Sequence, residues 1–392
     1  MSVVKDTGER ARMPPFGEEH EELRATIRRW VESEIVPRQD EWEEAREFPR
    51  ELYDRAGQLG FLGLKYPVEL GGQGGDYLHD AVWVEELPAA GASGGVAAGL
   101  GAHTGIATPP IHKFGTPDQH ERFLRPAISG EKVAALGITE PGAGSDVASI
   151  KTHAEKVDGG YIVNGSKTFI TNGVRADMLV AAVKTTPEGG HHGMSFLILE
   201  RDAEGYQVSR KLEKMGWHAS DTGELAFSDL FVPEENLLGE ENGGFYLIMA
   251  NFQWERIQMA LGAVGGMRCA LETTLAYAKE REAFGRPIGN FQVIRHKIAE
   301  MATKMEVARA VTYNALRMFV EGQDAIREVT IAKLFTQRAA VEVADEAVQI
   351  HGGYGYMREY HVERGLRDAR LGPIGGGSDE IMKEILGRGM GL

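Results

Sequence analysis

Cysteine is almost absent from the 392-residue chain, in which Cys269 is the only one. A disulfide within the chain is therefore excluded, and so is a metal site made of several thiolates. The histidine, aspartate and glutamate residues also show no spacing that predicts a metal site. We therefore expect no bound metal.

Long hydrophobic runs are also lacking. The most apolar stretch, residues 245–267, is interrupted by Asn251, Gln253 and the charged pair Glu255 and Arg256, so it does not predict a transmembrane helix. The first residues, MSVVKDTGERARMPPF, lack the apolar segment of a signal peptide. We expect a soluble protein without membrane insertion, located in the cytoplasm, or in the mitochondrial matrix if the chain is a processed eukaryotic protein.

Positive charge is scarce as well. The chain has 43 Lys and Arg against 58 Asp and Glu, and its net charge is −15 at pH 7. Because nucleic-acid binding requires Lys and Arg to neutralise phosphates, we expect no nucleic-acid partner. A hydrophobic content of 42% is ordinary for a globular protein with a large core, and the length suggests two or three domains.

The hydrophobic periodicity divides the chain into three parts. Residues 1–135 predict helices, because apolar residues recur about every 3.6 positions in segments such as EEHEELRATIRRWVESEIVP. Residues 136–240 contain short alternating runs and the turn DGG, which predicts a hairpin in an antiparallel β domain. Residues 241–392 return to the helical period, with long helices predicted at 244–279, 296–321 and 328–349. No strand–helix–strand alternation occurs, so the predicted fold class is α+β, with helices, then a sheet, then a helical bundle.

Glu255 and Arg256 are the only charged residues between 245 and 267, on a predicted helix that is apolar on most sides. Charged side chains are rarely buried without a partner, so a structural ion pair with a neighbouring helix is one interpretation. The other is a general base, because burial raises the pKa of a carboxyl group towards neutral pH. We favour the catalytic interpretation.

The segment GPIGGGSDEIM, residues 372–382, places three glycines directly before a sequence typical of a helix N-terminus. Glycine leaves the backbone accessible and free to adopt positive φ. The segment therefore predicts that a ligand approaches this backbone closely. It contains no obvious side chain that would act on such a ligand.

Other segments are ambiguous without further context. The loop GITEPGAGSD, residues 137–146, is either an ordinary turn or a binding loop. Arg281, Phe284 and Gln292 lie between two predicted long helices, where a solvated loop is the simplest interpretation. Glycine patterns at 142–147 and 160–168 approach nucleotide-binding motifs, but they fall among predicted strands with no following helix, so we assign them to turns.

Taken together, the segments GITEPGAGSDVASIKT, KTFITNG, REAFGRPIGNFQ, QIHGGYGYM and RDARLGPIGGGSDEIM resemble, in order and spacing, those of the acyl-CoA dehydrogenases. The similarity covers essentially the whole chain. Its pattern is closest to the long-chain and isovaleryl-type enzymes. The resemblance implies the helix–sheet–helix fold of that family and FAD as the cofactor.

Several residues acquire expected roles from this resemblance. The flavin ring is expected to contact Leu136, Thr139, Gly144, Ser145, Phe169, Ile170 and Thr171. The adenosine diphosphate half is expected to contact, from a neighbouring subunit, Arg281, Phe284, Gln292, Gln349, Gly352 and Gly353. A helix N-terminus beside the FAD would be formed by Ser378, Asp379 and Glu380. A clamp supplied by a neighbour implies a homodimer as the minimum and a homotetramer as the expected assembly.

Much of the family has a catalytic glutamate where this chain has Gly376. The resemblance implies that the Gly376 backbone N–H still donates to the thioester carbonyl, as in an oxyanion hole. The long-chain and isovaleryl-type enzymes carry the base on the first C-terminal helix instead, and Glu255–Arg256 matches their Glu–Arg pair. Glu255 is therefore the expected general base.

The implied reaction is α,β-dehydrogenation of an acyl-CoA to the trans-2-enoyl-CoA. Glu255 would take the α-proton, the β-hydrogen would leave as hydride to flavin N5, and an electron-transferring flavoprotein would take up the electrons. The residues expected to line the substrate channel are Ser145, His191, His192, Tyr246, Gln253, Trp254, Arg256, Gly376 and Gly377.

Two alternatives to this reaction remain open. One is a flavin oxidase or monooxygenase of the same fold that reacts with oxygen. The other is a non-catalytic relative that only binds acyl-CoA. The length and branching of the acyl group are also open, since the missing side chain at Gly376 leaves room for branched as well as long straight chains.

Overall fold

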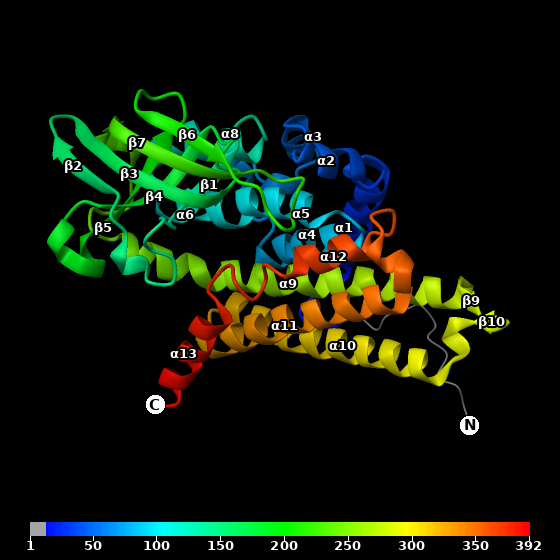
Figure 1. Ribbon diagram of the computed structural model, residues 1–392. Helices are drawn as coiled ribbons and strands as arrows, with labels where there is room; N and C mark the ends of the chain where they lie inside the picture. Colours follow the sequence, from blue (N-terminus) through cyan, green and yellow to red (C-terminus); the bar gives the residue numbers. More distant parts are fainter. Residues whose placement is uncertain (1–12) are drawn as a thin grey trace.

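The computed structural model describes residues 13–392. The first twelve residues of the predicted N-terminal domain, which begin the stretch MSVVKDTGERARMPPF, lie outside the described residues. Figure 1 shows helices, a sheet and a bundle of long helices in chain order. This order confirms the predicted α+β class. Strand β1 begins at Ala134 and helix α9 at Gly244, close to the predicted domain limits at 135 and 240.

The N-terminal part consists of short helices, several of them joined through π-helical turns. Thr116 caps one helix start, since its hydroxyl accepts a hydrogen bond from Gln119 N and Pro117 occupies the first helical position. The helices are α1 (Glu18–Trp30), α2 (Gln39–Ala45), α3 (Glu51–Gln58), α4 (Tyr77–Ala89), α5 (Gly94–Gly101), α6 (Thr108–Phe114), α7 (Pro117–Gln119) and α8 (Arg125–Ile128). The π-helical turns are Val31–Ile35, Ala102–Ala107 and His120–Leu124.

The middle part is one sheet in the order β6-β7-β3-β2-β4-β5-β8, with β1 beside β4. Its strands are β1 (Ala134–Gly137), β2 (His153–Val157), β3 (Gly160–Thr171), β4 (Met178–Lys184), β5 (Met194–Glu200), β6 (Tyr206–Lys211), β7 (Thr222–Pro233) and β8 (Leu237–Leu238). The predicted hairpin is confirmed, because β2 and β3 pair antiparallel around Gly159 at φ +77°. The sheet is mostly antiparallel, but β1 runs parallel to β4.

The C-terminal part contains the long helices. The bounds are α9 (Gly244–Glu280), α10 (Gln292–Val320), α11 (Ile326–His351), α12 (Val362–Ala369) and α13 (Asp379–Gly389), with a small hairpin of β9 (Glu282–Ala283) and β10 (Arg286–Pro287) after α9. The three long helices agree with their predicted ranges to within a few residues. No helix within residues 13–392 is long and apolar enough to cross a membrane.

Helix α9 connects the parts of the molecule. It packs against α4 of the N-terminal part, against β5 of the sheet and against α10 and α11 of the bundle. Figure 1 shows it running from the sheet to the far end of the bundle, where the β9–β10 hairpin projects. The first turns of α9 therefore lie close to the sheet, and the helix connects it to the two helical parts.

Candidate active site

Glu255 lies in the first third of α9 and has no partner for its carboxylate. Its Oε2 atom is buried and forms no hydrogen bond among the described residues, and no ion pair of Glu255 occurs there. Burial raises the pKa of Glu255 to about 7, although the charges of Arg256 and Lys333 act in the opposite direction. The ion-pair interpretation is therefore not met by the geometry, because neither cation bonds to the carboxylate.

Arg256 follows on the same helix and is also poorly satisfied. Its Nε is buried without a hydrogen-bond partner within residues 13–392, and its guanidinium lies 5.5 Å from the ring centroid of Phe252. Burial lowers the pKa of Arg256, with Glu255 opposing the shift. Two adjacent charged groups with unmet bonding capacity are typical of a site that awaits a ligand.

The glycine loop, residues 372–377, faces Glu255. Gly376 and Gly377 have φ of +60° and +95°, in the left-handed region that favours glycine. A Cβ atom added at Gly376 would lie 3.6 Å from Glu255 Oε1 and 2.3 Å from Met259 Sδ. The fold thus brings together the two residues expected to be catalytic, and Met259 leaves no room for a side chain at position 376.

The backbone N–H of Gly376 forms no hydrogen bond among the described residues. The loop then enters α13, where the Ser378 hydroxyl accepts a hydrogen bond from Ile381 N at 3.4 Å. Ser378, Asp379 and Glu380 therefore form a helix N-terminus, as expected. A free amide beside a free carboxylate provides a donor and a base within one small site.

Helix α11 holds the glycine loop from behind. The Nζ of Lys333 donates to the carbonyl oxygens of Gly372, at 2.9 Å, and of Gly377. Arg338 forms an ion pair with the buried Asp379 at 2.6 Å. These contacts fix both ends of the loop relative to the bundle.

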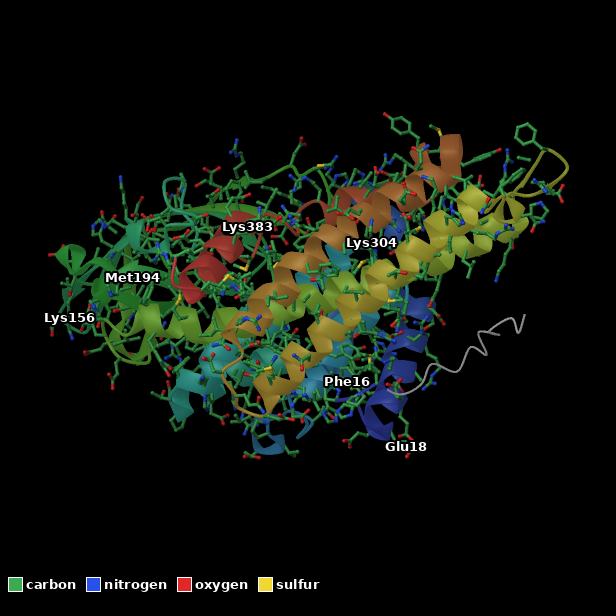
Figure 2. All side chains as sticks on the ribbon, turned by 90° about the horizontal axis from the view of Figure 1, so that it is seen from below. Phe16, Glu18, Lys156, Met194, Lys304 and Lys383 are labelled. Carbon is green, nitrogen blue, oxygen red and sulfur yellow. The ribbon has the colours of Figure 1, made fainter. Side chains whose placement is uncertain are left out.

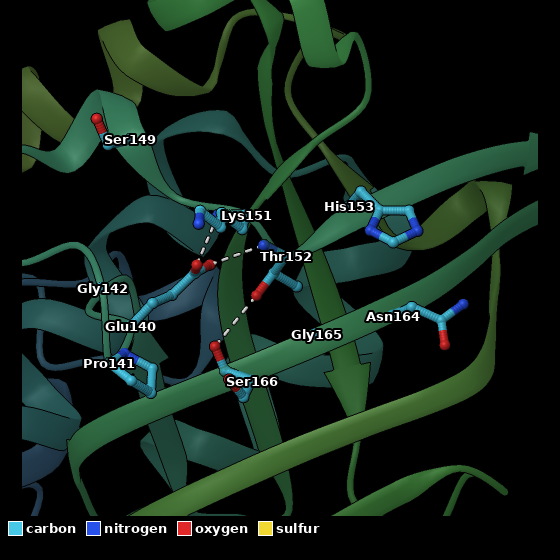
Figure 3. Close-up of a pocket in the computed structure, with 10 residues that line it drawn as sticks. All are labelled: Glu140, Pro141, Gly142, Ser149, Lys151, Thr152, His153, Asn164, Gly165 and Ser166. Atoms are coloured by element: carbon cyan, nitrogen blue, oxygen red, sulfur yellow. Dashed lines mark hydrogen bonds between the residues drawn. The ribbon is translucent and has the colours of Figure 1, made fainter.

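The loop at 137–146 is held by a second buried glutamate. Glu140 forms an ion pair with the fully buried Lys167 at 2.7 Å and accepts hydrogen bonds from Lys151 N at 2.6 Å and Thr152 N at 3.0 Å. Figure 3 shows the two bonds from the backbone amides to Glu140, beside a cavity of about 380 Å³. Although burial acts against it, the pKa of Glu140 is lowered by Lys167 and by the hydrogen bonds that the carboxylate accepts. Glu140 is a structural anchor of the loop.

The expected flavin-loop residues do not all present side chains to solvent. Leu136 and Thr139 are half-buried, whereas Gly144 and Ser145 are exposed. A Cβ atom at Gly144 would meet nothing within 4 Å. The tip of the loop therefore has open space over it.

Strand β3 contains a bulge that turns the side chain of Phe169 towards solvent. The register with β7 shifts between Lys167 and Ile170, and Phe169 has φ of +60°. As a result Phe169 is 69% exposed, Thr171 is half-buried, and Ile170 points into the sheet core. Phe169 and Thr171 are free to contact a ring, whereas Ile170 offers only its backbone.

The expected adenosine clamp lies at the other end of α9. Arg281, Gly352 and Gly353 line a cavity of about 500 Å³, and Phe284 on the hairpin is 95% exposed at φ +53°. Gln292 and Gln349 are exposed too. Arg281 directly follows α9 and comes 26 residues after Glu255, which is about 39 Å at 1.5 Å per residue.

The expected substrate-channel residues separate into two groups. His191 and His192 are exposed on a 3₁₀ turn, where His191 packs on Phe245 at 5.2 Å. Tyr246 is 67% exposed near the start of α9, and Gln253 is half-buried.

The expectation for Trp254 is wrong. Its side chain is only 2% exposed. It packs between the rings of Tyr77 and Phe319, with ring centroids 4.6 Å and 5.7 Å away. One residue along a helix turns the side chain by about 100°, so Trp254 faces the core while Glu255 faces the glycine loop.

One group of potential metal ligands was not expected from the sequence: Glu19, His20 and His79 lie close together. The Nδ1 atom of His20 accepts a hydrogen bond from Gly17 N at 2.9 Å. The Nδ1 atom of His79 lies 2.8 Å from Asp76 Oδ1 and 3.3 Å from Asp76 N. The two rings act as helix-start caps.

Sequence reasoning also missed Glu140, Lys167, Met259 and Lys333. The signal for Lys333 was present, since it is a single charge within the apolar run IAKLF on α11. The signal for Glu140 was weaker, because a glutamate in a loop is normally exposed. Met259 lies one turn after Glu255, on the same helix face.

Three family models match the chain over most of its length. They are the acyl-CoA dehydrogenase N-terminal domain at residues 17–131, the middle domain at 135–230 and the C-terminal domain at 242–391. An acyl-CoA dehydrogenase of Bacillus subtilis is 41% identical, covering 93% of this chain and 96% of its own. The mouse long-chain specific enzyme and the rice isovaleryl-CoA dehydrogenase, both mitochondrial, are each 38% identical over 95% of this chain, and 86% and 91% of theirs.

Solved structures agree. A probable acyl-CoA dehydrogenase from Mycobacterium abscessus superposes with a TM-score of 0.93 at 45% identity, covering 95% of this chain and 99% of that one. A chain from a structure of the electron transferring flavoprotein of Acidaminococcus fermentans has a TM-score of 0.93 at 38% identity, covering 97% and 99%. A prolyl acyl carrier protein oxidase has a TM-score of 0.92 at 31% identity, covering 96% and 100%.

The fold, the arrangement of the glycine loop and these similarities lead to one assignment. The chain belongs to the acyl-CoA dehydrogenase family and is a flavin-dependent oxidoreductase that dehydrogenates acyl-CoA.

Proposed function

We propose that the chain converts a long or branched acyl-CoA to its trans-2-enoyl-CoA, with Glu255 as the general base. The observation that carries the proposal is the partnerless carboxylate of Glu255 beside the unpaired N–H of Gly376. A carboxylate with a buried, unbonded oxygen destabilises the folded state. A role in proton abstraction explains why the chain retains an unpaired carboxylate at this position.

FAD is the cofactor, and the residues present fit it. The open space over Gly144, the outward-facing ring of Phe169 and the half-buried hydroxyl of Thr171 suit a flat ring laid against the end of β3. The N-terminus of α13 suits an anionic group. When bound, FAD supplies the acceptor for the hydride that leaves the β-carbon.

The protein's own contribution is positioning and proton transfer. The Gly376 N–H donates to the thioester carbonyl and stabilises the negative charge that develops there as the α-proton leaves. Glu255 accepts that proton on its carboxylate. A pKa of about 7 makes Glu255 basic enough to accept the proton while remaining largely ionised slightly above neutral pH.

Two classes of acyl group are proposed as substrates. Relatives named for long-chain and for isovaleryl substrates are equally similar to this chain. The space that a side chain at position 376 would fill is taken by the flexible side chain of Met259, and a Met that moves aside would admit either class of acyl group.

A second copy of the chain is proposed to complete the FAD site. Arg281 lies about 39 Å from Glu255 along the axis of α9, beyond the reach of one extended FAD whose ring lies at Glu255, and Gly352 lines the same cavity as Arg281. The exposed Phe284 and Arg281 of one copy would thus hold the adenosine end of FAD in another. We propose a homodimer as the minimum and a homotetramer as the assembly.

An electron-transferring flavoprotein is proposed as the electron acceptor. The similarity to a chain in the structure of such a system supports this choice. The similarity to a prolyl acyl carrier protein oxidase favours one alternative, an oxidase that uses oxygen and a carrier-bound acyl group. A non-catalytic binding role is disfavoured, because it gives the unpaired Glu255 no purpose.

The proposal is tested by anaerobic titration of the flavin-containing protein with acyl-CoAs of graded length and branching. We expect bleaching of the flavin absorbance with long or branched substrates, then rapid reoxidation by an electron-transferring flavoprotein and slow reoxidation by oxygen. Bleaching only by carrier-bound acyl groups, with fast oxygen turnover, would favour the oxidase. No bleaching by any thioester would refute dehydrogenation.

A further inference from the structure

Lys333 is buried in a way that is unusual for lysine. Its exposed fraction is 0%, and it lies within the apolar run IAKLF on α11. Lysine is almost never fully buried unless it is paired. No carboxylate forms an ion pair with Lys333 among the described residues, so its burial requires another explanation.

The ammonium of Lys333 binds the two ends of the glycine loop. It donates to the carbonyl oxygens of Gly372 and Gly377, which bracket the residue that faces Glu255. Gly376 is itself conformationally free, since it has no side chain and adopts positive φ. Lys333 therefore restrains a segment that would otherwise position its N–H poorly.

Four charged groups act on Lys333 from the surrounding elements. Asp379 and Glu380 on α13 and Glu255 on α9 favour its protonated form, whereas Arg256 disfavours it. Burial is the largest influence and lowers the pKa of Lys333 to about 8, so the side chain stays mostly protonated at neutral pH. In turn its charge acts against the rise in the pKa of Glu255.

A purely structural role does not account for the choice of a cation. A neutral amide donor would also satisfy a backbone carbonyl, and it would avoid much of the cost of removing a charge from water. The additional property that only the ammonium supplies is a positive charge, which acts on the carboxylates of Asp379 and Glu255.

We propose that Lys333 is a positioning residue that aligns the Gly376 N–H with the thioester carbonyl and keeps Glu255 ionised for proton abstraction, an inference that rests on the proposed dehydrogenation. Lys333 touches neither substrate nor flavin and transfers no proton. It acts through the glycine loop and through its charge.

The test compares two substitutions by anaerobic stopped-flow flavin reduction across pH. Lys333→Met removes both the donors and the charge, whereas Lys333→Gln removes the charge but retains an amide donor. The matched control is Lys304→Met on α10, where the lysine is partly exposed and pairs with Glu342 at 2.6 Å; Figure 2 shows Lys304 among the side chains of that helix. FAD content and helical content are measured first for every variant.

We expect Lys333→Met to lower the limiting rate of flavin reduction by about 10²-fold, the typical cost of misplacing a reacting group by about 1 Å, with little change in acyl-CoA binding. Lys333→Gln should lose less. In both variants the acid limb of the pH profile should move to higher pH, because Glu255 then loses a stabilising positive charge. A smaller shift of the carbonyl stretch of bound thioester should accompany the loss of rate, and Lys304→Met should match the wild type.

Four results would contradict parts of this account and are distinguishable. Wild-type protein that is never reduced by acyl-CoA overturns the proposed dehydrogenation itself. An active wild type with unchanged rates and pH profiles in both Lys333 variants overturns the positioning role alone. Reduced rates with an unchanged acid limb of the pH profile overturn the proposed effect of the Lys333 charge on Glu255. Loss of FAD and helical content in both variants assigns Lys333 to folding and overturns the proposal.

Discussion

Glu140, which is buried, and Glu255, which is half-buried with a buried Oε2, have opposite surroundings. Glu140 bonds to Lys167 and to two backbone amides, and these partners lower its pKa against the effect of burial. Glu255 has no bonded partner, and burial raises its pKa to about 7. Bonding partners, and not burial alone, therefore distinguish a carboxylate that anchors a loop from one that is free to accept a proton.

The largest effect on stability is expected from Glu140→Gln. The substitution leaves Lys167 buried without its counter-charge, and breaking a buried pair by removing one partner costs about 3–5 kcal/mol. The free energy of unfolding should therefore fall, as measured by denaturant unfolding of the FAD-loaded protein at pH 8. An unchanged unfolding midpoint would show that the loop is anchored by other contacts.

Glu255→Gln is expected to change stability in the opposite direction. A carboxyl whose pKa is raised from 4.5 to about 7 on folding binds a proton more tightly in the folded state, so it lowers stability as pH rises through that window. Above pH 7 the loss in the free energy of unfolding reaches about 3 kcal/mol, since each pKa unit corresponds to about 1.36 kcal/mol. Unfolding at pH 8 should thus be harder for Glu255→Gln than for the wild type, with no difference at pH 4.

Moving the base tests whether the two positions share one site. Glu255→Gly with Gly376→Glu places a carboxylate where much of the family has it, but the new Cβ would collide with Met259 Sδ and the residue would need φ near +60°. Adding Met259→Ala should relieve the collision. We expect recovery of flavin reduction on the order of tenfold over Glu255→Gly, since an imperfectly placed base retains part of a contribution of 10²–10⁴-fold.

Recovery in the triple variant that is larger for straight than for branched acyl-CoA would support the assigned pocket. Equal rates in Glu255→Gly and in the triple variant would separate the two positions and contradict a shared site.

The smallest effect is expected at the far end of α9. Arg281→Ala removes an exposed cation that lies 5.2 Å from the ring of Tyr354, so it should lower FAD occupancy after dialysis without changing helical content. Full retention of FAD would place the adenosine clamp elsewhere. Exposed Lys383→Ala on α13, labelled in Figure 2, is the control of matched charge.

Much of this arrangement could be predicted from the sequence. The helix periods, the DGG turn and the isolated charges Glu255 and Arg256 follow from local rules, which is why the order of elements and the outlying carboxylate were found. The glycine run before Ser378 also indicated its positive-φ backbone correctly.

What could not be predicted depends on contacts between distant segments. The partners of Glu140, and the absence of partners for Glu255, arise only when β3 and the glycine loop meet other elements. Lys333 became informative only when its carbonyl acceptors were visible. The misplaced Trp254 is different, because a helical wheel already separates it from Glu255.

The most direct test of the central claim is anaerobic stopped-flow reduction of the flavin by acyl-CoA in Glu255→Gln, measured across pH beside the wild type. Gln preserves the volume and hydrogen-bonding reach of the side chain but cannot accept the proton. We predict that the wild-type rate rises with pH through about 7 as Glu255 ionises. In Glu255→Gln the rate should fall by at least about 10²–10⁴-fold and lose this pH dependence, with FAD and acyl-CoA still bound. A near-normal rate in Glu255→Gln would contradict the account and leave Glu255 without a catalytic role.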